Sequence, residues 1–144
     1  MRAILQRSLE AKVEIDQKVV GKIDKGLVVL VGFTDGDNSL VIDKMIEKIV
    51  NLRIFDDNNG VMNKSILDIE GQILSVSQFT LYANTSKGRR PSYVEALNPE
   101  EATVLYDEFN QKLRKHVKVE TGVFGANMQV SLINDGPITI SLEY

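Results

Sequence analysis

The sequence contains no cysteine, and His116 is its only histidine. The absence of cysteine excludes disulfides, thiolate nucleophiles and thiolate metal ligands, and it is typical of proteins in a reducing compartment. A single histidine without a partner Ser, Cys or second His provides neither a catalytic triad nor a zinc or iron site. His116 stands among lysines at the predicted end of a helix, so we predict a solvent-exposed residue. We expect no metal and no cofactor, and chemistry that comes from hydroxyls, carboxylates, backbone groups or the substrate itself.

Long apolar runs are also missing. The longest, Leu27 to Val31, is far too short to cross a bilayer, and a polar break within Met1 to Arg7 argues against a signal peptide. The net charge of −3 argues against a general nucleic-acid coat protein. We therefore predict a cytoplasmic protein with no membrane partner and no DNA partner. A cationic cluster over 112–118 is interpreted as a solvated helix end that complements the helix dipole.

The length of 144 residues fits one domain over residues 1–144. Apolar spacing predicts one helix over 39–52 and a second that begins at Asn98-Pro99, a favourable N-cap followed by a first-turn proline. Strand patterns occupy 2–7, 13–15, 19–23, 27–33, 73–81, 117–120, 128–133 and 138–142. The predicted fold is an α+β domain in which a curled or barrel-like sheet is flanked by two helices. The acidic turn 56–60 lacks the spaced ligands of a calcium loop and is interpreted as a simple turn.

The segment 77–82, Ser-Gln-Phe-Thr-Leu-Tyr, is the first candidate for chemistry. Strand alternation would place Ser77 and Phe79 on one face and Gln78 and Thr80 on the other. At a strand end beside the polar loop 84–92, such residues offer hydroxyls and unpaired N–H groups to a bound ester or carboxylate. Read alone, the segment is equally consistent with a half-buried strand whose hydroxyls are satisfied.

The second candidate is the segment 134–139, which contains Gly136-Pro137. One interpretation is an ordinary turn before the last strand. The other starts from the X-Pro bond, where a cis peptide is energetically accessible. A cis Gly-Pro pair would point two carbonyls in nearly the same direction and form a wall without side chains. Such a wall would exclude a substituent sterically.

Both candidates, and much of the chain around them, resemble the D-aminoacyl-tRNA deacylases. The likeness covers nearly the whole chain, and its most specific part is the block from Ser77 to Ser92. The stretch 8–13 departs from the usual family pattern. Its charged residues are expected at the surface, so we expect altered surface and unaltered chemistry. The other matching blocks are 1–7, 26–32, 51–55, 62–65, 122–130 and 134–137.

The resemblance implies a homodimer of barrel-like subunits that hydrolyses the ester between a D-amino acid and the terminal adenosine of tRNA. It implies that the segment 77–80 forms the catalytic pocket. A cis Gly136-Pro137 pair would enter the pocket of the other subunit and reject L-amino acids, with Arg7 and Met128 also at the substrate site. Hydrolysis of glycyl-tRNA would follow as a side activity. A basic loop, Lys87, Arg89 and Arg90, would hold acceptor-stem phosphates, unless it is only a solvated loop.

For the chemistry, we hypothesise that the 2′-hydroxyl of the terminal ribose activates water while amides near Phe79 and Thr80 stabilise the oxyanion. Thr80 as a nucleophile is the rival assignment, and it would need a base that the sequence does not reveal. Two other functions remain open. One is a tRNA-binding module without catalysis, and the other is a hydrolase of free D-amino-acid esters.

Overall fold

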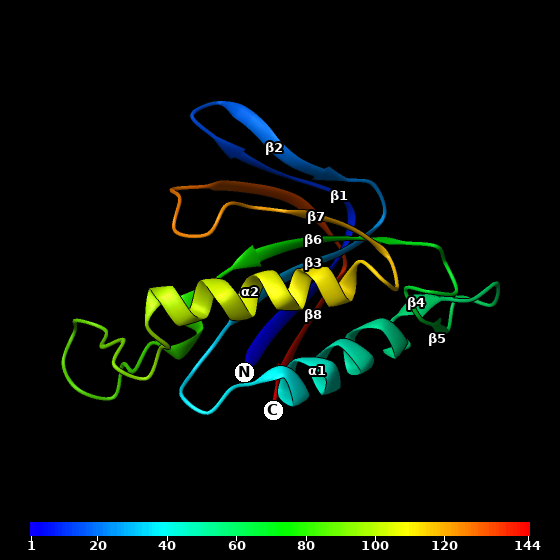
Figure 1. Cartoon of the computed structure of the whole chain (residues 1–144). Coiled ribbons are helices and arrows are strands. Elements are labelled where there is room, and N and C mark those ends of the chain that lie inside the picture. The colour runs from blue at the N-terminus through cyan, green and yellow to red at the C-terminus, as the bar shows by residue number, and fades with distance from the viewer.

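The strand β1 (Arg2–Ile15) organises the sheet in the computed structural model, which describes residues 1–144 (Figure 1). Its first half pairs antiparallel with β3 (Gly26–Gly32) and its second half with β2 (Lys18–Ile23). The last strand, β8 (Gln129–Glu143), runs antiparallel to β1 over nearly its whole length. Because β1 joins three strands, the sheet curls into a barrel-like form, as the sequence predicts.

Two parallel strands extend the sheet beyond β3. The strand β6 (Gln72–Ser77) pairs parallel with β3, and β7 (Lys118–Thr121) pairs parallel with β6. The strands β4 (Phe55–Asp56) and β5 (Met62–Lys64) form a separate two-stranded sheet. Between them, a carboxylate oxygen of Asp57 accepts hydrogen bonds from the N–H groups of Asn59 and Val61. The acidic segment is thus the turn that the sequence predicts.

Both predicted helices are present, and the second begins at its predicted cap. The side chain of Asn38 accepts from the first turn of α1 (Ser39–Asn51), and that of Asn98 accepts from the Glu101 N–H in α2 (Pro99–Leu113). The Asn98 side-chain amide also donates to the Glu101 carboxylate at 2.6 Å, which fixes the side chain of the cap. Both helices lie on the same side of the sheet (Figure 1). No helix is long and apolar enough to cross a membrane.

The apolar core lies mainly between this helical layer and the sheet. One cluster of 21 buried residues includes Met45 and Ile49 of α1 and Phe109 of α2. A smaller cluster of six, including Val28 and Leu74, fills the other face of the curled sheet. Burying such a side chain contributes about 1.5–3 kcal/mol, so the two clusters hold the sheet between them. His116 follows α2 and is exposed, as predicted.

Three strand predictions differ from the structure. The patterns 2–7 and 13–15 belong to one strand, β1, and the patterns 128–133 and 138–142 belong to one strand, β8. The predicted strand 73–81 ends at Ser77 and is followed by a 3₁₀ turn, η1 (Phe79–Tyr82). The neighbouring strand β3 ends at Gly32, so the chain beyond Ser77 has no parallel ladder to join. The alternation predicted for Ser77 to Thr80 was therefore wrong.

Candidate active site

A cavity of about 590 Å³ lies where the parallel strands β3 and β6 end. The start of α2 and the segment 124–128 form its other walls. Of its 19 lining residues, none is Asp, Glu, Lys, Arg or His. The polar side chains of the lining are Ser77, Gln78, Tyr93, Asn98 and Asn127. The cavity therefore contains no ionisable side chain at neutral pH to act as a general base.

Three of the four predicted catalytic residues, Ser77, Gln78 and Phe79, line this cavity. The Gln78 N–H donates to the Val31 carbonyl at 2.7 Å, which fixes the end of β6 against β3. Thr80 does not line the cavity, and its hydroxyl accepts a hydrogen bond from the Gln78 side-chain amide. The structure thus brings Ser77, Gln78 and Phe79 to one cavity but leaves Thr80 outside its lining.

The backbone N–H groups of Phe79 and Thr80 are candidate hydrogen-bond donors next to the same cavity. Phe79 and Thr80 are the first two residues of the turn η1, so their N–H groups have no acceptor within that turn. Arg2 holds the other end of the turn, because its guanidinium donates to the Leu81 carbonyl at 3.0 Å and lies 4.5 Å from the Tyr82 ring centroid. The turn therefore carries two N–H groups without an acceptor inside it, and the first belongs to Phe79, which lines the uncharged cavity.

Gly32 permits the close approach of β3 to this turn. A Cβ atom at position 32 would lie 2.7 Å from the Gln78 carbonyl oxygen, closer than such atoms approach in proteins. The next residue, Phe33, accepts a hydrogen bond at 2.9 Å from the Leu97 N–H. The C-terminal end of β3 thus positions both the candidate segment 77–80 and the segment before α2.

Exposed aromatic side chains stand at the cavity. The rings of Phe79 and Tyr93 meet edge to face, with centroids 5.0 Å apart, and Phe79 is 56% exposed. Met128, a predicted substrate-site residue, lines the cavity and also packs against the smaller apolar cluster. Sequence reasoning missed Tyr93, Asn98 and Asn127. Tyr93 directly follows the basic loop, and that position was the one available signal.

The Gly136-Pro137 bond is cis. Both residues are exposed, in a stretch of β8 where the pairing with β1 shifts register, and neither lines the cavity of its own chain. Arg7, only 5% exposed, fixes this stretch: its guanidinium donates to the Asp135 carbonyl at 3.2 Å. It also donates to the Ile54 carbonyl at 2.9 Å and lies 3.3 Å from an Asp56 carboxylate oxygen. Within one chain, the two candidate segments are thus not brought together.

The basic loop is exposed and also stands outside the cavity lining. Its base is closed by two hydrogen bonds between Asn84 and Ser92, of 2.8 and 3.0 Å. Lys87, Arg89 and Arg90 form no ion pair with any carboxylate. The loop therefore presents three free cations, three to six positions before Tyr93 of the cavity wall.

Comparisons with known proteins show the family of this chain. The family model described as D-Tyr-tRNA(Tyr) deacylase matches residues 4–143. A D-aminoacyl-tRNA deacylase of Thermosipho africanus (strain TCF52B) is 57% identical, over 99% of this chain and 97% of the relative. A solved structure described as c-Myc DNA unwinding element binding protein is 39% identical, with a TM-score of 0.95 over 100% of this chain and 99% of that one. A probable eukaryotic D-amino acid tRNA deacylase shares the fold, at 19% identity and a TM-score of 0.84 over 98% and 97% of the two chains.

The barrel-like fold and these matches define an enzyme, a hydrolase that acts on aminoacyl-tRNA. More narrowly, the chain belongs to the D-Tyr-tRNA(Tyr) deacylase family.

Proposed function

We propose that this enzyme removes D-amino acids from tRNA as a homodimer, and that Gly136-Pro137 of one subunit excludes L-amino acids from the cavity of the other. The observation that carries the proposal is the uncharged cavity at Ser77–Phe79, beside the first two N–H groups of the turn η1, those of Phe79 and Thr80. The proposed selectivity is supported by the Gly136-Pro137 stretch. This stretch is exposed, is held by the Arg7 guanidinium, and lies outside the cavity of its own chain.

In the proposed reaction, the ester carbonyl oxygen lies against the N–H groups of Phe79 and Thr80. Water attacks the carbonyl carbon, and these donors stabilise the negative charge that develops on the oxygen. The bond to the ribose 3′-oxygen then breaks, and the proton lost by water reaches that oxygen. Because the lining has no ionisable base, the neighbouring 2′-hydroxyl of the terminal ribose assists this transfer.

Thr80 fits a positioning role better than a nucleophilic one. Its hydroxyl accepts a hydrogen bond from Gln78, a neutral amide that cannot take its proton. A threonine nucleophile needs a neighbouring base, and the cavity lining contains none.

Backbone atoms suit the chiral filter because they exclude an L side chain sterically and form no specific contact with a D side chain. Gly136 and Pro137 are exposed and carry no polar side chain, so we propose that a partner's substrate meets their main chain. An L side chain would collide with this wall, a D side chain would point away, and the hydrogen of glycine would fit either way. Glycyl-tRNA is therefore a second expected substrate.

Apolar exposure around the same stretch supports a subunit contact. Leu9 is 48% exposed and Ile133 is 51% exposed, and they flank the pair formed by Ser8 and Asn134. Burying exposed apolar side chains beside the Gly136-Pro137 stretch would favour association of two copies.

The basic loop is the proposed contact for acceptor-stem phosphates. Lys87, Arg89 and Arg90 are exposed, unpaired with carboxylates, and three to six positions before Tyr93 of the cavity. Neutralising all three should weaken tRNA binding and flatten its dependence on salt. An unchanged slope would remove the loop from the tRNA contact.

The test is release of amino acid from matched D- and L-tyrosyl-tRNA by the purified protein. Rapid loss of the D ester with the L ester spared would support the activity and the filter together. Loss of both would leave a deacylase and refute the filter, and loss of neither with tRNA still bound would indicate a binding module. Equal activity on a free D-tyrosine ester would instead indicate a small-molecule hydrolase.

A further inference from the structure

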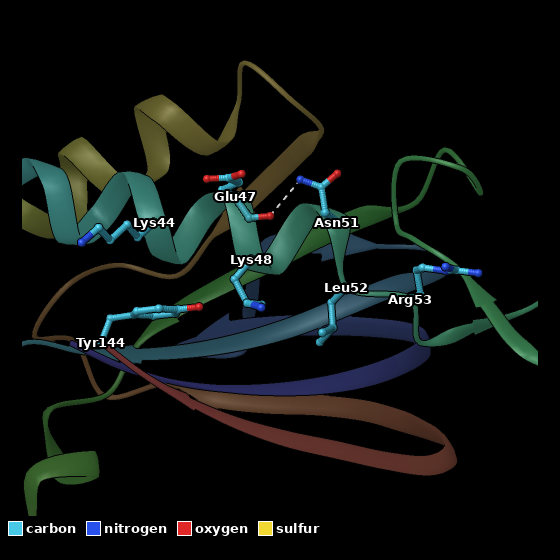
Figure 2. Close-up of a pocket in the computed structure, with 7 residues that line it drawn as sticks. All are labelled: Lys44, Glu47, Lys48, Asn51, Leu52, Arg53 and Tyr144. Atoms are coloured by element: carbon cyan, nitrogen blue, oxygen red, sulfur yellow. Dashed lines mark hydrogen bonds between the residues drawn. The ribbon is translucent and has the colours of Figure 1, made fainter.

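A groove beside α1 has no part in the chemistry described so far. It encloses about 590 Å³ and is lined chiefly by the exposed face of the helix (Figure 2). Lys44, Lys48 and Asn51 come from α1, Arg53 follows the helix, and Tyr144 forms the opposite wall. Figure 2 shows the Tyr144 ring extending beneath α1 toward Lys48.

Positive charge in this groove is not neutralised within the chain. Lys44, Lys48 and Arg53 are exposed, and none forms an ion pair with a carboxylate. Arg53 uses only its Nε, which donates to the Asn63 carbonyl at 2.9 Å. Glu47 is the one acidic side chain in the lining, and it forms no ion pair with the three cations.

A lysine of the neighbouring helix shows the contrast. Lys112 of α2 lies 2.6 Å from the Asp43 carboxylate and 2.9 Å from that of Glu108, so its charge is satisfied where the two helices meet. The groove cations lack such partners. Unpaired cations gathered at one groove attract a polyanion rather than a neutral ligand.

One end of the groove leads to the stretch that carries Gly136-Pro137. Arg53 directly precedes Ile54, whose carbonyl accepts from the Arg7 guanidinium at 2.9 Å. The same guanidinium donates to the Asp135 carbonyl at 3.2 Å, one residue before Gly136. The buried Arg7 side chain therefore contacts both the residue after Arg53 and the residue before Gly136.

We infer that this groove binds the phosphodiester backbone of the tRNA substrate. The inference rests on the proposed function, in which the Gly136-Pro137 stretch of one subunit enters the cavity of the other. The groove would then lie beside the aminoacyl end held in the partner's cavity. The substrate class supplies the polyanion, and the half-exposed Tyr144 ring supplies apolar surface for a ribose or a base.

The dimensions of the groove suit a short run of phosphates. The helix rises about 10 Å between Lys44 and Asn51, at roughly 1.5 Å per residue. One strand of duplex DNA carries a charge about every 3.4 Å along the axis, so at a similar spacing in tRNA the groove spans about three phosphates. Three cations thus meet about as many negative charges.

The decisive experiment compares two variants that each lose three positive charges. The groove variant is Lys44→Gln, Lys48→Gln and Arg53→Gln. The control variant is Lys18→Gln, Lys22→Gln and Lys25→Gln, in and beside β2 on the opposite side of the molecule from α1 (Figure 1). Binding of uncharged full-length tRNA is measured over a series of salt concentrations, with duplex DNA of equal length as a second probe.

We expect the groove variant to bind tRNA at least about tenfold more weakly at low salt, with a log–log salt slope shallower by about 2 to 3. The control variant should keep both the affinity and the slope to a greater extent. Equal behaviour of the two variants would overturn the inference. An equal loss of duplex DNA binding would overturn the assignment to tRNA and indicate a general polyanion surface.

A short substrate separates this inference from the proposed function. D-Tyrosyl-adenosine has the ester and the ribose but no acceptor stem, so the groove variant should hydrolyse it as fast as the unaltered enzyme. Loss of that activity as well would show an effect through the fold and would overturn the inference. Because the binding measurement uses uncharged tRNA, it decides the groove even if the proposed chiral selectivity fails.

Discussion

Arg7 contacts Asp135 in two ways, through the carbonyl oxygen at 3.2 Å and through a carboxylate oxygen at 3.1 Å. These residues are 128 positions apart in the sequence, and Asp135 stands directly before Gly136. A planar guanidinium satisfies both acceptors and two more near β4, a set that a lysine ammonium on a flexible stem does not reproduce. The buried Arg7 therefore connects the Gly136-Pro137 stretch to the rest of the fold.

Replacement of Arg7 by lysine should reduce chiral selectivity more than catalysis. The cavity is untouched, but the Asp135 contacts that fix the proposed filter are lost. We expect the ratio of D- to L-tyrosyl-tRNA hydrolysis rates to fall at least about tenfold, and the free energy of unfolding to fall by about 3 kcal/mol. Initial rates on both esters and urea denaturation measure these effects. Asp135→Asn, which keeps the carbonyl contact, should have the smaller effect; a larger one would contradict this account.

Thr80→Ala should leave turnover within about threefold of the unaltered enzyme, because the proposed oxyanion donor at this position is the backbone N–H. Single-turnover rates on D-tyrosyl-tRNA measure this, with Thr80→Ser as the conservative control. A drop of about a thousandfold in the alanine variant, rescued by serine, would establish the hydroxyl as nucleophile and remove the substrate-assisted mechanism.

Gly32→Ala should impair both catalysis and stability. The added Cβ would lie 2.7 Å from the Gln78 carbonyl oxygen, so the turn that presents the Phe79 N–H has to move. We expect kcat to fall at least about tenfold and the free energy of unfolding to fall by about 1–3 kcal/mol. Gly36→Ala is the matched control, because it is strained by its positive φ of 89° but meets no atom within 4 Å. Equal losses of kcat in the two variants would show that general destabilisation explains the effect.

Acid stability should depend on the polar contact between the helices. The Ser39 hydroxyl donates to the Glu108 carboxylate, and together with Lys112 it holds the pKa of Glu108 below its ordinary value of 4.5. A carboxyl group whose pKa is lowered by folding contributes stability above pH 4.5, and that contribution is lost as the pH falls through the lowered value. Urea denaturation between pH 6 and about pH 3 should therefore show a smaller loss of stability in Glu108→Gln than in the unaltered protein. Identical pH dependence in both proteins would exclude this contact as a source of acid sensitivity.

Local signals in the sequence were sufficient for the helices and their caps. Asn98 caps α2 where predicted, and Asn38 caps α1 directly before the predicted start of that helix, because a cap depends on residues within one turn. The end of β6 was not predictable in the same way. Apolar residues continue to Leu81, but the strand stops at Ser77 because its neighbour β3 ends, and that end is a property of pairing between distant segments.

The candidate site was predicted in the same uneven way. Ser77, Gln78, Phe79 and Met128 were identified and line one cavity, whereas Tyr93 and Asn127 were missed. The missed residues come from loops whose position depends on tertiary contacts. One such contact is the hydrogen bond from the Thr34 hydroxyl to the Glu95 carbonyl, at 2.6 Å. No local sequence pattern predicts this contact.

The uncharged lining of the cavity limits the effect that amino-acid substitutions have on catalysis by this enzyme. If the main chain supplies the working donors, an alanine scan leaves them in place and reports chiefly on folding. Replacing a single backbone amide by an ester, at Phe79 or Thr80, removes a donor while keeping every side chain. Amino-acid substitutions change side chains and, proline apart, leave the backbone N–H donors in place. Natural substitutions would therefore alter the substrate specificity of the cavity far more readily than its catalytic mechanism.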